Sequence, residues 1–168
     1  KLAQANYAFM GGRSPIVPET QKQADALEHA LRARMPGVTV RCFLAMRYWR
    51  PFTKDAAKAA KEWRATEALL LPLYPQFSTT TTASSLKEWR RCSALRATTL
   101  CCYPADQNFA AAHADAILEA WRAAGSPSSP RVLFSAHGLP QRVVDRGDPY
   151  QWQVAQTVAA VRAKLPPD

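Results

Sequence analysis

The sequence lacks any hydrophobic run long enough to cross a bilayer. A membrane-spanning helix needs about 20 consecutive apolar residues, whereas the longest candidate run, residues 68–73, is interrupted by Pro72. The first six residues also lack an initiator methionine and the apolar stretch of an export signal. We therefore expect a chain that begins in mid-protein. Its expected location is cytoplasmic, with or without peripheral contact to the inner membrane.

The sequence also lacks motifs for nucleotide binding, for a catalytic serine nucleophile and for an iron–sulfur cluster. The 6 glycines form neither a G-x-G-x-x-G fingerprint nor a P-loop, and Ser135 lacks the flanking glycines of a nucleophile elbow. The 4 cysteines show no C-x-x-C spacing, and the adjacent pair, Cys101 and Cys102, should point to opposite faces of a strand. The sequence thus predicts reduced core thiols, no tightly bound cofactor and no ligands for an iron–sulfur cluster.

The remaining composition is that of a globular domain with an excess of positive charge. Hydrophobic residues make up 48% of the chain, charged residues 21%, and the net charge is +9. Such a charge is compatible with nucleic acid, an anionic membrane surface or an acidic substrate. The arginines are scattered, however, and no basic stripe alternates with stacking aromatic residues. We therefore expect no nucleic-acid partner.

Helical and strand-like patterns alternate along the chain. Apolar residues at helical spacing predict five helices, near residues 19–35, 53–63, 78–92, 105–124 and 149–164. Short apolar runs between them predict four strands, at 38–46, 68–73, 98–103 and 131–135. Strands that alternate with helices form parallel sheets. The expected fold class is therefore α/β, a doubly wound parallel sheet flanked by helices, incomplete because its opening strand is missing.

The ends of the predicted strands are where such a sheet binds its ligands. Of the three histidines, His29 and His113 lie within helices and are assigned no role, whereas His137 follows a predicted strand and precedes a glycine. His137 is therefore the candidate for chemistry. The hydroxyl-rich stretch 78–85 is interpreted as a polar helix start, whose free amides could also hold a carboxylate.

Five segments carry a more specific signal, because each resembles a motif of the ferrochelatase family and they occur in the family's order. They are M-G-G-R-S-P at 10–15, M-R-Y-W-R-P-F-T at 46–53, L-P-L-Y-P-Q-F-S-T-T-T-T-A-S-S-L at 71–86, F-S-A-H-G-L-P at 134–140 and G-D-P-Y at 147–150. Together they span nearly the whole chain, so chance is a poor explanation. The chain resembles mainly the first half of a bacterial-type ferrochelatase.

This resemblance implies an activity and a set of site residues. Ferrochelatases are lyase-type metal chelatases that insert ferrous iron into protoporphyrin IX in the last step of heme biosynthesis, so Fe(II) is implied as a substrate. By motif, His137 is implied as the catalytic metal ligand or proton acceptor, a role that suits a neutral imidazole. Substrate-binding roles are implied for five further residues: Arg47, Tyr48, Tyr74, Ser78 and Ser135.

The resemblance also implies what this chain leaves out. Neither the family's opening strand nor the acidic residues of its second half have a match, so residues 1–145 correspond to a first chelatase-like domain and residues 146–168 to the start of the second half. We expect the chain alone to be inactive, and an exposed edge to favour its self-association. Two alternatives stay open: a cobalt or sirohydrochlorin chelatase, and a noncatalytic tetrapyrrole-binding domain.

Overall fold

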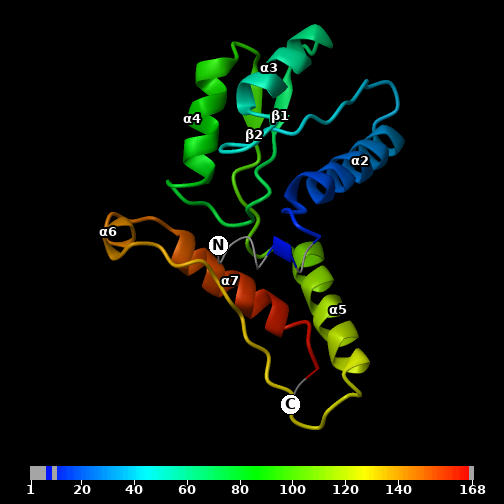
Figure 1. The fold of residues 1–168 in the computed structure, drawn as a ribbon, viewed down its shortest axis with the longest axis vertical. Helices are drawn as coiled ribbons and strands as arrows, with labels where there is room; N and C mark the ends of the chain where they lie inside the picture. Colours follow the sequence, from blue (N-terminus) through cyan, green and yellow to red (C-terminus); the bar gives the residue numbers. More distant parts are fainter. Residues whose placement is uncertain (1–6, 9–10, 167–168) are drawn as a thin grey trace. The chain divides into compact units, whose positions relative to one another are not determined.

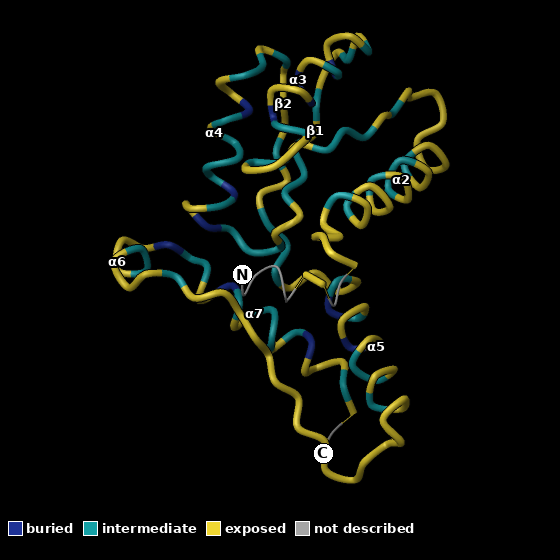
Figure 2. Tube along the Cα trace, viewed as in Figure 1, coloured by how far each residue is buried: buried dark blue, intermediate teal, exposed yellow. Residues whose placement is uncertain are grey.

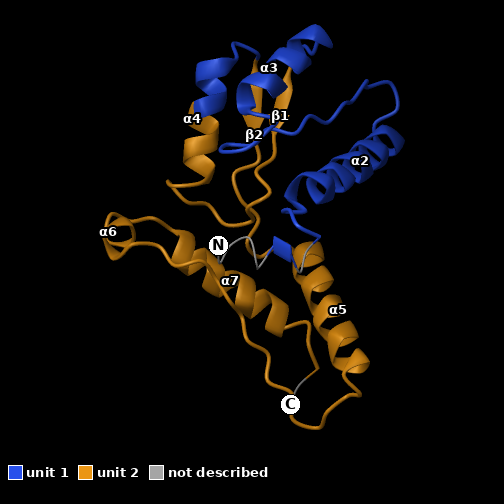
Figure 3. Cartoon of the chain, viewed as in Figure 1, with its two compact units in different colours: residues 1–66, 88–95 blue, residues 67–87, 96–168 orange. Residues whose placement is uncertain are grey.

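The computed structural model describes residues 7, 8 and 11–166, so Met10 of the first motif lies outside the described residues. The chain divides into two compact units (Figure 3). Unit 1 comprises Lys1–Thr66 and Glu88–Leu95, and unit 2 comprises Glu67–Lys87 and Arg96–Asp168. The two units are described separately below.

Unit 1 contains α2 (Ile16–Arg34) and α3 (Thr53–Glu62), which an irregular segment connects (Figure 1). α2 carries Glu19 in its first turn and arginines in its last, an arrangement that the helix dipole stabilises. α3 begins after Phe52, whose backbone N–H donates to the Asp55 carboxylate at 2.9 Å. Four residues of α3 are buried: Thr53, Ala56, Ala57 and Ala60. Their spacing of i, i+3, i+4 and i+7 places them on one face of α3, which is therefore its buried face.

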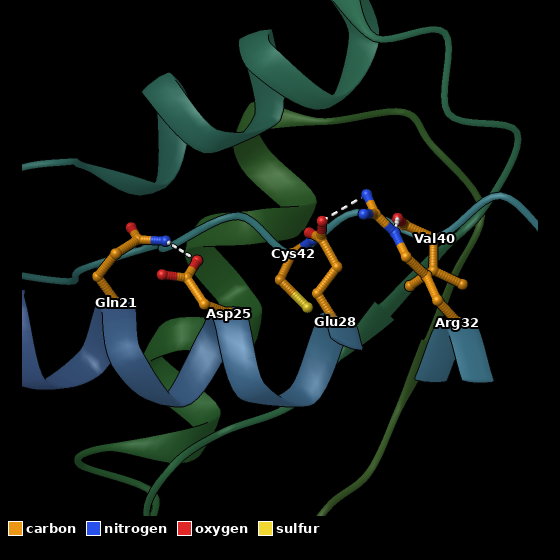
Figure 4. Close-up of polar contacts among 6 residues, drawn as sticks. All are labelled: Gln21, Asp25, Glu28, Arg32, Val40 and Cys42. Carbon is orange, nitrogen blue, oxygen red and sulfur yellow. Dashed lines mark hydrogen bonds and ion pairs between the residues drawn. The ribbon is translucent and has the colours of Figure 1, made fainter. Parts of the chain in front are cut away.

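The prediction of a strand at 38–46 is wrong. The backbone of this segment forms hydrogen bonds to side chains and within a turn instead of to a second strand. Glu28 of α2 accepts the Cys42 N–H at 2.7 Å, and the Arg32 side chain donates to the Val40 carbonyl at 3.3 Å (Figure 4). The Met46 N–H donates to the Pro51 carbonyl at 2.8 Å. A strand requires a ladder of bonds to a second backbone, and here side chains of α2 replace part of it.

Unit 2 contains a two-stranded parallel sheet of β1 (Ala68–Leu70) and β2 (Ala97–Thr99), in which Ala68 pairs with Ala97. The chain passes from β1 to β2 through α4 (Thr82–Cys92), whose last residues belong to unit 1. A helix therefore connects parallel strands, as the alternating pattern predicts, and the α/β class is confirmed. Both strands are shorter than the apolar runs that predict them.

The core of unit 2 lies between α5 (Gln107–Ala123) and α7 (Tyr150–Arg162). The Asp106 carboxylate caps α5 by accepting the amides of Asn108 and Phe109. Three residues that are at most 2% exposed form the centre of this contact: Ala110, Ala114 and Val161 (Figure 2). Within the described residues, no helix is both long and apolar enough to cross a membrane.

The predicted strand at 131–135 is also wrong. Residues 130–140 form an irregular, mostly exposed segment that leads to the short helix α6 (Gln141–Val144). The backbone of 131–135 makes no hydrogen bond to any other described residue, although Leu133 and its neighbours are apolar. β-propensity reflects packing against neighbouring strands, and none lies beside this segment in the described part of the chain.

Candidate functional site

Asp148, immediately before α7, joins the hydroxyl-rich segment to the G-D-P-Y motif. Its Oδ2 accepts hydrogen bonds from the Ser78 hydroxyl at 3.0 Å and from the Thr79 amide and hydroxyl at 2.8 and 2.6 Å. Its Oδ1 accepts the Tyr150 N–H at 3.0 Å. Burial alone would raise the pKa of the Asp148 carboxyl, but the bonds from Thr79, Tyr150 and Ser78 outweigh it and hold the pKa below its ordinary value.

Gln153 and Thr157, one turn apart on α7, hold the two loops that follow β1 and β2. The Gln153 side chain accepts the Phe77 N–H at 2.7 Å. The Thr157 hydroxyl donates to the Pro104 carbonyl at 2.7 Å and accepts from the Gln76 side chain at 2.8 Å. Each loop leaves the carboxyl end of a parallel strand, the edge at which sheets of this class bind ligands, so α7 holds the chain at that edge.

We expect Asp148→Asn to lower the free energy of unfolding of the full-length protein by about 2 kcal/mol at pH 7, because an amide cannot accept the same set of charge-assisted bonds. A carboxyl whose folded pKa is depressed stabilises the fold above its unfolded pKa, about 3.9, and this contribution disappears as the pH falls. The variant should therefore lose less stability than the wild type between pH 6 and pH 3. Urea unfolding at several pH values measures both effects.

Asp145→Asn is the matched control for this experiment. Asp145 is exposed, and among the described residues its carboxylate accepts only from the Gln141 side chain, at 2.7 Å and within the same short helical turn. Its substitution should change the free energy of unfolding by less than about 0.5 kcal/mol. Equal destabilisation by both substitutions would contradict the role that we assign to Asp148.

Tyr74 and Ser78 of the Y-P-Q-F-S segment lie in very different environments. Tyr74 is 58% exposed, so its hydroxyl is accessible from solvent. Ser78 is 1% exposed, and its hydroxyl bonds to Asp148 and to Thr80. Tyr103 donates from its hydroxyl to the Pro72 carbonyl at 3.1 Å and from its backbone N–H to the Pro75 carbonyl at 2.8 Å. The segment is thus held by several hydrogen bonds, whereas Tyr74 within it is exposed.

Ser135 and His137 lie in the exposed irregular segment of unit 2. Both are exposed, and neither side chain hydrogen-bonds to another described residue. Neither ring nitrogen of His137 is therefore engaged by another described residue. Its predicted position at the end of a strand is not observed, because residues 131–135 form no strand.

Arg47 and Tyr48 lie in unit 1, in the turn that precedes α3. The Arg47 guanidinium stands over the Tyr48 ring, 4.8 Å from its centroid, which is a cation–π geometry. Tyr48 is 76% exposed and Arg47 is half-buried. A planar guanidinium can form two parallel hydrogen bonds to a carboxylate.

Unit 1 also contains an open cavity of about 400 Å³ between α2, the 41–44 segment and α3. Nine residues line it: Gln21, Arg41, Cys42, Phe43, Leu44, Pro51, Asp55, Ala56 and Ala59. Burial raises the pKa of the Cys42 thiol, and Glu28 and Asp25 of α2 raise it further. None of the predicted site residues lines this cavity, so the cavity is not the predicted site.

Two features of the site were not predicted from the sequence. The first is the pair Gln153 and Thr157. The sequence pattern that could have indicated it is two polar residues one turn apart on a helix that also carries valines. The second is the contact of Asp148 with Ser78 and Thr79, because the sequence marks Asp148 only as a helix N-cap and as part of G-D-P-Y. In the described part of the chain, no three residues among His, Cys, Asp and Glu are grouped to hold a metal ion.

Similarity to known proteins extends along the whole chain. A family model described as Ferrochelatase matches residues 1–168. The chain is 52% identical to a ferrochelatase of Hyphomonas neptunium over 99% of its length, and 56% identical to those of Caulobacter vibrioides and Phenylobacterium zucineum over 99%. It covers 47%, 49% and 49% of these proteins, so it spans about half the length of the curated relatives that it matches.

Proposed function

This chain belongs to the ferrochelatase family, and from that premise we propose that the protein carrying it inserts ferrous iron into protoporphyrin IX, the last step of heme biosynthesis. The observation that carries the proposal is the match to proteins named Ferrochelatase at 52–56% identity over nearly the entire chain. In this reaction one Fe(II) enters the macrocycle and two pyrrole protons leave. Fe(II) is thus a substrate, and the enzyme is a metal chelatase of the lyase type.

A spectroscopic assay with the full-length protein tests the proposal. We expect saturable formation of zinc protoporphyrin from Zn(II) and protoporphyrin, and of protoheme from Fe(II) under anaerobic conditions. Turnover of sirohydrochlorin with cobalt but not of protoporphyrin would instead indicate the other chelatase class. Porphyrin binding without metal insertion would indicate a noncatalytic tetrapyrrole-binding domain.

In the proposed mechanism, His137 is the metal ligand or the acceptor of a pyrrole proton. A neutral imidazole has one nitrogen lone pair, which can serve in either role. The exposure of His137 and the absence of a hydrogen bond from the described residues support this role, because none of those residues competes for the lone pair.

The other predicted residues are proposed to bind the porphyrin. Arg47 and Tyr48 would contact a propionate and the adjoining ring. Tyr74 and Ser135 are exposed, as direct contacts to a substrate require. Ser78 is proposed to act differently: its hydroxyl is buried against Asp148, so it would position Thr79 and Thr80 rather than touch the substrate.

Arg47→Lys in the full-length protein should lower kcat/KM by about tenfold or more, mainly through a higher KM. Lysine keeps the charge but cannot form two parallel bonds to a carboxylate, and a charge-assisted bond contributes about 1.5–3 kcal/mol. Steady-state kinetics with protoporphyrin measure the effect. Arg50→Lys, an exposed position in the same turn, is the control and should leave KM within twofold.

The finer organisation of the whole protein is also a proposal. We propose that the protein carrying this chain contains the doubly wound sheet predicted from its sequence, to which the parallel pair β1 and β2 belongs. The boundary near residue 145 stays a prediction, although α7 packs against α5 within unit 2. A cytoplasmic location, with or without peripheral membrane contact, is proposed from the same family membership.

A further inference from the structure

The adjacent thiols of Cys101 and Cys102 approach each other, contrary to the sequence prediction. Their sulfur atoms lie 2.7 Å apart. The prediction that they point to opposite faces of a strand is wrong because β2 ends at Thr99, and alternation does not extend into the irregular backbone that follows. Cys101 is exposed and Cys102 is half-buried. One side of the pair is therefore open to solvent.

The surroundings of the pair hold it in place. On one side, the Leu100 N–H donates to the Leu70 carbonyl at 3.0 Å, and on the other the Tyr103 N–H donates to the Pro75 carbonyl at 2.8 Å. The Gln153 amide group donates to the Cys102 sulfur at 3.8 Å. The backbone on both sides and one of the two sulfurs are thus positioned before any ligand arrives.

We infer that Cys101 and Cys102 form a dithiol site for a thiophilic trivalent metalloid, the class to which organic arsenoxides belong. Thiolates are soft ligands, and a pyramidal trivalent centre can bind two sulfurs that lie close together on one side of it, as those of Cys101 and Cys102 do. A linear two-coordinate ion would need the sulfurs on opposite sides of it. A tetrahedral ion would need further ligands, and no group of three metal-ligating residues occurs among the described residues.

The covalent step balances without an oxidant. In the reaction with phenylarsine oxide, both S–H bonds and the As=O bond are broken, two As–S bonds form, and the two protons leave with the oxygen as water. The hydrogen bond to Cys102, together with burial, raises the pKa of the Cys101 thiol to about 11. Both thiols are consumed with their protons, so binding of the arsenoxide should be nearly independent of pH between 6 and 8. A divalent cation would release two protons instead, and its affinity would rise about 100-fold per pH unit.

The test is titration of the reduced full-length protein with phenylarsine oxide, followed by intact-mass spectrometry and by thiol counting. We expect one adduct per chain at the 101–102 pair. Cys101→Ser and Cys102→Ser should each weaken binding by about 10²–10⁴-fold, because the second As–S bond is intramolecular. Cys42→Ser and Cys92→Ser are the matched controls and should bind as the wild type does. Peptide mapping of the adduct locates the arsenic.

Three outcomes would overturn the inference: no adduct on the native protein, an adduct that persists in Cys101→Ser, or tighter binding of Cd(II) than of the arsenoxide. Binding measured in 6 M urea shows how much of the affinity comes from the two cysteines being adjacent in sequence and how much from the fold. Binding at least tenfold weaker in urea is expected if the fold holds the sulfurs together, and equal binding would contradict it. Cys102→Ala serves as a second variant if Cys102→Ser is poorly folded.

Discussion

His137→Ala in the full-length protein should reduce kcat for zinc insertion into protoporphyrin by about 10²–10⁴-fold, the range over which a positioned acid–base group contributes. The imidazole is the proposed metal ligand or proton acceptor, and alanine can serve as neither. The free energy of unfolding should change by less than about 0.5 kcal/mol, because the side chain is exposed and packs into no core. Metal-insertion kinetics and urea unfolding of the same preparations provide the two measurements.

His29→Ala is the matched control for His137→Ala. His29 is an exposed histidine in α2 and has no assigned role, so its substitution should leave both kcat and stability unchanged. Near-normal zinc insertion by the His137→Ala protein would remove His137 from the mechanism. A large loss of stability would instead show that the residue contributes to folding.

The 168-residue chain by itself should form no zinc protoporphyrin above the uncatalysed rate. It spans about half the length of the relatives that it matches. Its described residues include no group of three metal-ligating side chains. A single imidazole offers too few ligands to dehydrate the metal ion and to accept two protons. Absorbance and fluorescence assays of the chain beside the full-length protein measure the difference, and saturable turnover by the chain alone would refute the prediction.

Sedimentation equilibrium of the same chain should show a dimer or a larger species. Three consecutive apolar residues of the irregular segment are exposed, namely Val132 at 42%, Leu133 at 83% and Phe134 at 43%, and the backbone of this segment makes no hydrogen bond to other described residues. Such a segment favours pairing with another chain. Leu133→Glu should shift the chain toward monomer, whereas Gln141→Glu should not. A wild-type chain that sediments as a monomer would contradict this prediction.

The sequence by itself determined the long helices and the family. α2, α3, α5 and α7 lie within a few residues of their predicted positions, because helical periodicity and capping depend on residues close together in the chain. The motifs around Tyr74 and His137 identified the family in the same local way. The α–β alternation likewise predicted the parallel pairing of β1 with β2.

Only the tertiary structure decided which distant groups meet. Asp148 bonds to Ser78 across 70 positions, and Gln76 bonds to Thr157 across 81, and no local pattern encodes such pairs. The same reason explains the two predicted strands that are not observed. An apolar run becomes a strand only where a second backbone completes its hydrogen-bond ladder. The Cys42 N–H donates to the Glu28 carboxylate instead. The approach of Cys101 to Cys102 likewise depends on where β2 stops, which pairing with β1 determines.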